Sequence, residues 1–119
     1  MTNSSILDDV RQMLGVSDSE SAFDEEIVMH INSTFNVLRQ LGVGPDDGFR
    51  ITGESDDETW DKFVDDPKTL NMVKSYMYLK VRLLFDPPTN GSLLEAFKNQ
   101  AAEYEWRMNV DVETDWNSN

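Results

Sequence analysis

The chain lacks several residue types on which common protein activities depend. It has no cysteine among its 119 residues, so disulfides and thiolate metal sites are excluded within it. It has one histidine, His30, and the positions three and four residues later hold Ser33 and Thr34 rather than a metal ligand or an acid–base partner. We therefore interpret His30 as a structural or surface residue, and we expect no enzyme activity, no metal site and no cofactor.

Long apolar runs and export signals are missing as well. No run approaches the ~18 residues that a membrane span needs, and Met1–Ser5 have neither the basic nor the apolar part of a secretory signal. A glycine-rich phosphate loop is also absent, because Gly42–Pro45 follows a predicted helix instead of a strand. We expect a soluble protein that is made in the cytoplasm and does not contact a membrane.

Positive charge is scarce, and the negative charge is unevenly distributed. The formal net charge is −13. Residues 1–66 carry 16 acidic and 4 basic side chains, and residues 67–119 carry 7 and 6, so the two parts have net charges of −12 and −1. A surface with this much negative charge repels nucleic-acid phosphates. Two interpretations remain open, a surface that keeps the protein soluble and a surface past which DNA slides without sticking.

Hydrophobic periodicity predicts an all-α fold, a small bundle of about four main helices in one domain. The capping residues and the glycine and proline stops place these helices near residues 6–14, 24–41, 67–85 and 92–109. We expect a single helical domain over residues 1–109. Residues 110–119 show no helical period and are predicted to form a mobile C-terminal tail.

The segment between the second and third helices is predicted to be a long, partly extended loop. Phe49 and Ile51 alternate with polar residues as in a short extended segment, and Trp60 and Phe63 have the spacing of a helical turn. Acidic residues crowd this loop, but the EF-hand pattern is absent. A solvated acidic loop is the simplest interpretation; its candidate residues are Asp46, Asp47, Asp56, Asp57 and Glu58.

The third helix is apolar on two sides. One side forms the expected core stripe from Leu70 to Leu84. A helix of this kind is either central to the fold or buried against another subunit. The second side is our candidate subunit interface and consists of Met72, Tyr76, Leu79 and Leu83.

Three tryptophans are many for a small acidic chain. We expect Trp60 and Trp106 at the edges of the core. Trp116 lies in the polar tail, and such a residue suits docking onto a partner by strand addition or by filling a pocket; an inert tail is the alternative. Our candidate docking residues are Trp106, Arg107, Val110, Val112 and Trp116.

The order and spacing of four segments resemble those of the small phage head–tail connector, or adaptor, proteins. The segments are Asp24–Gly44, Thr59–Trp60, Val73–Pro88 and Glu103–Asn109. The most distinctive parts are the Leu-Phe-Asp-Pro-Pro helix stop and the Glu-x-Glu-Trp-Arg-Met-Asn sequence near the end of the fourth helix. The resemblance covers about residues 5–109, and neither part is a catalytic motif.

The resemblance implies a virion protein at the head–tail junction. Such proteins form a homo-oligomeric ring of about twelve copies that docks under the portal protein, extends the DNA channel, and receives a stopper or tail-completion protein. They help to retain the genome and to join the tail. DNA passes through without sequence-specific binding, so the acidic loop becomes a candidate lining of the channel. In this family the C-terminal region tends to contact the portal.

Two other function classes compete with the connector interpretation. An acidic helical protein can mimic DNA and inhibit a DNA-handling enzyme, although such mimics spread their acids over a whole face. A small packaging accessory that contacts the terminase is the other alternative, and its loss would stop assembly before DNA fills the head.

Overall fold

The computed structural model describes residues 5–17 and 21–117, with residues 111–117 described by their backbone alone. This part of the chain is all-helical. Its α-helices are α1 (Ile6–Leu14), α2 (Asp24–Gln40), α3 (Pro67–Phe85) and α4 (Gly91–Asn117), and two short 3-10 turns are η1 (Ser21–Phe23) and η2 (Trp60–Lys62). No strand forms in the described residues, where one isolated bridge joins Ser5 to Thr59. The predicted all-α bundle of four main helices is confirmed.

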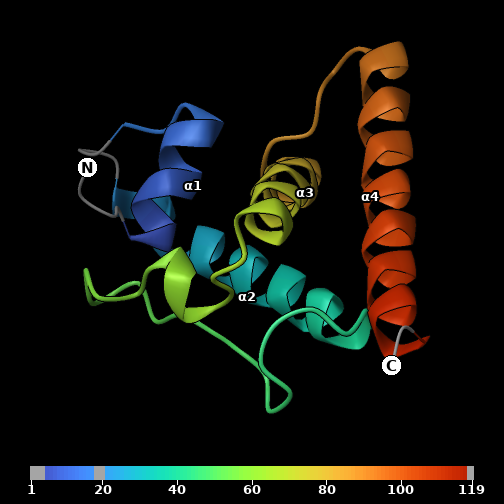
Figure 1. Cartoon of the computed structure of the whole chain (residues 1–119). Coiled ribbons are helices and arrows are strands. Elements are labelled where there is room, and N and C mark those ends of the chain that lie inside the picture. Colours follow the sequence, from blue (N-terminus) through green and yellow to red (C-terminus); the bar gives the residue numbers. More distant parts are fainter. Residues whose placement is uncertain (1–4, 18–20, 118–119) are drawn as a thin grey trace.

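Helix α3 is the centre of the bundle. It packs against α1, α2 and α4, and α4 lies along the side of α3 away from α1 (Figure 1). The buried residues of α3 span more than one face, because Leu79 and Val81 are both buried although they lie two positions apart, about 200° around the helix axis. The sequence indicated that a helix apolar on two sides is either central or subunit-bound, and within this chain it is central.

The helix ends follow from their capping residues. Ser5 accepts a hydrogen bond of 3.1 Å from the backbone N–H of Asp8, and Gly15 ends α1 in the left-handed conformation with φ of 76°. Asp66 caps α3 by accepting bonds from the backbone N–H and the hydroxyl of Thr69, at 3.1 and 2.7 Å. These bonds lower the pKa of the Asp66 carboxyl, because they favour its charged form.

The loop between α2 and α3 is held by side chains rather than by a sheet. The amide of Asn32 on α2 donates to the carbonyl of Ile51 at 2.9 Å and accepts from its N–H at 2.7 Å. An aromatic cluster anchors the rest of the loop, with ring centroids of Phe35 and Phe63 4.6 Å apart and those of Phe35 and Phe49 5.0 Å apart. Trp60 forms the predicted helical turn and is buried.

The predicted end of the fourth helix at residue 109 is wrong. Helix α4 does not end at residue 109 but continues through Val110 and Val112 to Asn117 (Figure 1). The physical reason is that no glycine or proline follows Gly91, so no residue forces the helix to stop. Valine lowers helix propensity only slightly. Residues 118–119 lie outside the described part of the chain.

Candidate functional site

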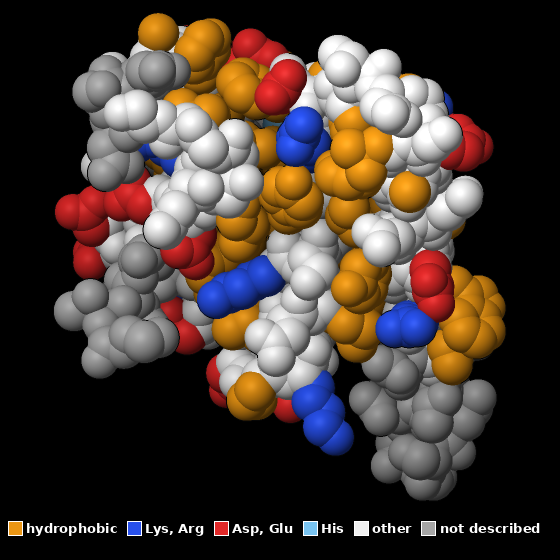
Figure 2. All heavy atoms as spheres, turned by 90° about the horizontal axis from the view of Figure 1, so that it is seen from above, with side chains coloured by type: hydrophobic (Ala, Val, Ile, Leu, Met, Phe, Trp, Pro, Cys, Tyr) orange, Lys and Arg blue, Asp and Glu red, His pale blue; other side chains and the backbone are white. Residues whose placement is uncertain are grey.

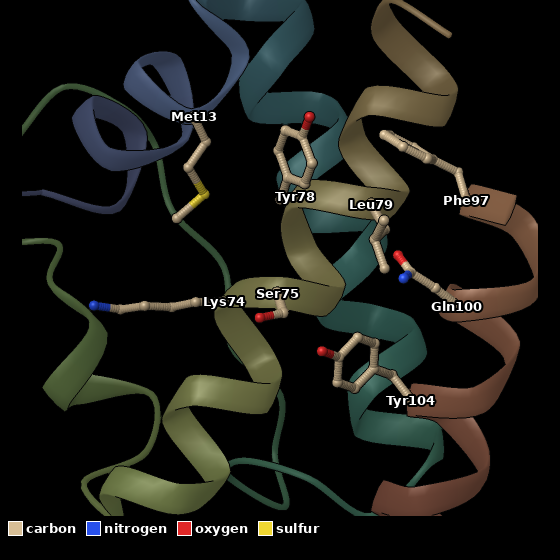
Figure 3. A pocket seen from close by; sticks show the side chains of 8 residues that line it. All are labelled: Met13, Lys74, Ser75, Tyr78, Leu79, Phe97, Gln100 and Tyr104. Atoms are coloured by element: carbon tan, nitrogen blue, oxygen red, sulfur yellow. The ribbon is translucent and has the colours of Figure 1, made fainter. Parts of the chain in front are cut away.

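The surface above α3 carries an apolar region. Figure 2 shows hydrophobic side chains gathered along the middle of this face, with acidic side chains mainly toward its edges. A groove of about 370 Å³ lies here, and Figure 3 shows residues from three helices around it. Its lining consists of Met13 from α1, of Lys74, Ser75, Tyr78 and Leu79 from α3, and of Phe97, Gln100 and Tyr104 from α4.

The groove walls are aromatic and packed. The rings of Tyr78 and Phe97 lie 5.9 Å apart, and the guanidinium carbon of Arg82 lies 5.7 Å from the centre of the Phe97 ring. Lys74 extends away from α4 (Figure 3), and its ammonium group lies 5.7 Å from the Trp60 ring and 3.9 Å from Asp9 Oδ2. The groove is therefore an apolar recess with polar groups at its margin, suited to binding an apolar or aromatic side chain.

Trp106 is an exposed residue and not, as predicted, a residue at the core edge. Its exposed fraction is 67%, larger than that of any other large hydrophobic residue among the described side chains. It stands on α4 beside the ion pair of Glu103 and Arg107, whose closest atoms are 2.7 Å apart. Tryptophan and arginine are enriched where protein partners bind, so this exposure supports the docking hypothesis for both residues.

The other docking candidates are less accessible or lie outside the description. Val110 is half-buried on α4. The side chains of Val112 and Trp116 lie outside the described side chains, and only their helical backbone is given. Strand addition by this segment does not fit the structure, because its backbone hydrogen bonds are used within the helix.

The predicted subunit interface on α3 is wrong for Tyr76, and Leu79 is accessible only as part of the groove lining. Tyr76 is fully buried and Leu79 is 4% exposed, because α4 of the same chain covers this side of α3. The Tyr76 hydroxyl also donates a 2.6 Å hydrogen bond to Glu105 on α4. Met72 and Leu83 are half-buried and remain candidates for an interface.

The acidic loop divides into exposed acids and one structural acid. Asp46, Asp47, Asp56 and Asp57 are exposed. Glu58 differs, because its carboxylate accepts hydrogen bonds from the backbone N–H groups of Thr52 and Gly53, at 2.7 and 2.8 Å. Glu58 thus holds the turn of the loop together, a role that the sequence analysis missed.

Sequence analysis also missed four polar contacts that organise the bundle. Arg11 is buried and lies 3.4 Å from both Asp8 and Asp24. The indole N–H of Trp60 donates to Asp9 at 2.7 Å. His30 lies 3.3 Å from Glu26, four residues before it; only later positions had been considered as partners. Each contact joins or braces helices, which is a structural role.

The described residues contain no cluster of three or more histidine or acidic side chains placed to hold a metal ion. Among the same residues, none of the helices combines the length and hydrophobicity that crossing a membrane requires.

Comparison with known proteins gives one match. The family model described as phage connector protein matches residues 6–115, which reach from the start of α1 into the last turns of α4. Neither a curated protein nor a solved structure matches the chain. Because the match spans nearly the whole chain and agrees with the resemblance seen in the sequence, this chain belongs to the phage connector protein family.

Proposed function

We propose that this chain forms an oligomeric adaptor ring between the portal and the tail of a phage particle. The ring extends the DNA channel, helps to retain the packaged genome and supports tail joining. The match to the phage connector protein family over residues 6–115 carries this proposal. The family supports a structural connector at the head–tail junction and gives no support to a catalytic role.

The exposed surfaces are consistent with a subunit that has several protein neighbours. Tryptophan is enriched among the residues that carry binding energy at protein interfaces, so the exposed Trp106 offers one apolar surface, and the groove over α3 offers a second. We propose that the C-terminal part of α4 docks onto a partner through residues that include Trp106 and Arg107. Met72 and Leu83 contribute to contacts between subunits.

The exposed acidic loop suits the lining of a DNA channel. Attraction between a channel wall and DNA would slow the passage of the genome, and a negative wall repels phosphates. We propose that the loop residues face the channel. The DNA that passes is not bound sequence-specifically. The candidate channel residues are Asp46, Asp47, Asp56 and Asp57, and Glu58 shapes the loop that carries them.

The charge distribution argues against one rival, and the stage of assembly distinguishes the other. A DNA-mimic inhibitor needs acids over an extended face, whereas residues 67–119 have a net charge of −1. A terminase-binding packaging accessory would act earlier in assembly than a connector. A connector and a packaging accessory therefore predict different assembly defects when the chain is lost.

Binding to the portal tests the proposal. Purified chain is mixed with purified portal ring, and the mass of the complex is measured by native mass spectrometry or sedimentation. The proposal predicts a portal ring that carries several copies of the chain. The portal is tested both as an isolated ring and in DNA-filled heads. If its mass stays unchanged in both cases, the proposal is contradicted.

A further inference from the structure

Two apolar surfaces of the second half of the chain lie on different sides of α4. On α4, Tyr104 lines the groove, and Trp106 follows two residues later. Residues two positions apart on a helix are separated by about 200° around its axis. Trp106 therefore projects from the side of α4 that faces away from α3, whereas Tyr104 points toward α3 and forms a wall of the groove (Figure 3).

The outer side of α4 is suited to close contact with a protein surface. Besides Trp106 it presents the exposed residues Asn99 and Ala102, together with the exposed acids Glu95 and Glu103, of which Glu103 is paired with Arg107. Tryptophan brings a large apolar ring and one N–H donor. The groove offers aromatic walls together with acceptor groups on Ser75 and Gln100, both of which are exposed.

We infer that the Trp106 side of α4 in one copy of this chain occupies the groove between α3 and α4 of the next copy. This inference rests on the proposed ring and names the surfaces that build it. Because the two surfaces are different, the contact is head-to-tail, a type of contact that forms a closed ring when the rotation between successive copies closes on itself.

The charge distribution identifies a second copy as the occupant. Residues 1–66 carry a net charge of −12, and any contact between two such parts would set like charges against each other. Both surfaces of the proposed contact lie instead almost wholly in residues 67–119, where the net charge is −1. Two copies can therefore meet here with little local repulsion.

The small size of the contact limits how firmly two isolated copies can associate. Helix α4 has 27 residues and is about 40 Å long, so even a strip about 10 Å wide along its whole length would offer no more than roughly 400 Å². This is about half of the ~800 Å² that each partner buries in a stable complex. Isolated copies should associate weakly, and the ring should form where copies are concentrated on the portal.

The absence of cysteine makes the contact testable by disulfide trapping in assembled particles. We would introduce Ser75→Cys in the groove together with Ala102→Cys beside Trp106, and oxidise purified particles. Cysteines cross-link only when their Cα atoms come within about 7 Å. The inference predicts a ladder of covalent multimers on a non-reducing gel, with Trp106→Asp added to the pair reducing the ladder several-fold. The pair Ser75→Cys with Asn99→Cys is an alternative if the first variant does not assemble.

The matched control joins Ser75→Cys to Asp47→Cys in the acidic loop, and it should remain monomeric. Particles that contain either groove pair but give monomers after oxidation would overturn the inference and leave the connector role intact. A ladder from the control pair as strong as that from the groove pair would overturn it too. Absence of the wild-type chain from particles would instead contradict the proposed function itself.

Discussion

The hydroxyl of Tyr76 on α3 donates a hydrogen bond of 2.6 Å to Oε2 of Glu105 on α4. Tyr76 is fully buried, and Lys80 Nζ lies 3.9 Å from the same carboxylate oxygen. This contact ties the long C-terminal helix to the centre of the bundle. It also explains why the second apolar side of α3 belongs to the subunit core.

The Tyr76 contact predicts a loss of stability in alkali. Burial, with a further contribution from Glu105, raises the pKa of Tyr76 above its usual value of about 10. Above that pH the unfolded chain loses a proton that the folded chain keeps, so the free energy of unfolding falls as the pH rises. Urea denaturation across this range should show the decline in the wild type and a smaller slope in Tyr76→Phe.

The same variant should lose about 1–2 kcal/mol of unfolding free energy at neutral pH, because a hydrogen bond to a charged group is removed. If Tyr76→Phe kept the full alkaline slope of the wild type, the assignment of the slope to Tyr76 would be wrong.

Glu58 and Asp57 should behave differently although they are adjacent acids. Glu58→Ala removes the acceptor of two backbone N–H groups and should lower the free energy of unfolding by about 1–2 kcal/mol. Asp57 is exposed, so Asp57→Ala should change it by less than about 0.5 kcal/mol. Urea denaturation of both variants checks this, and equal effects would show that Glu58 does not organise the loop.

Replacing Gly44 is predicted to lower the free energy of unfolding for two reasons. Its φ is +92°, and an added Cβ would lie 2.4 Å from Cε1 of the buried Phe63 ring. Gly15 is the matched control, because its φ is also positive but an added Cβ meets nothing within 4 Å. Gly15→Ala should cost about 1–2 kcal/mol from backbone strain. Gly44→Ala should cost about 1–3 kcal/mol more, and equal melting temperatures of the two variants would contradict this packing.

The acidic loop should influence DNA passage without influencing folding. Replacing its exposed aspartates by asparagine should leave the free energy of unfolding within about 0.5 kcal/mol of the wild type. If the loop lines the channel, particles with this variant should eject DNA more slowly at fixed salt. The control replaces exposed acids elsewhere, Glu25→Gln and Glu95→Gln. Equal ejection rates of the two variants would favour the solubility interpretation. The loop residues to replace are Asp46, Asp47, Asp56 and Asp57.

Local sequence signals predicted the helices well. Asp66 before Pro67 marked the start of α3, and Pro87 marked its end, because proline fixes φ and cannot donate a hydrogen bond. The end of α4 was missed because it lacks any such signal. The absence of a helical period in residues 110–119 suggested a mobile tail, but nothing there prevents the helix from continuing.

Long-range contacts could not be predicted from spacing. Asn32 pairs with Ile51, 19 residues away, and Trp60 pairs with Asp9, 51 residues away. Periodicity showed that α3 is apolar on two sides but not that α4 covers Tyr76 and Leu79. Tertiary packing decides which of two apolar sides stays exposed.

The most direct test of the connector role is removal of the gene from its phage, followed by electron microscopy of the lysate, with the wild-type gene supplied in trans as the control. The connector role predicts heads that filled with DNA, some of them emptied again, beside separate tails. Unfilled proheads would assign the chain to the packaging machinery, and normal tailed particles would contradict a structural role and favour the inhibitor class.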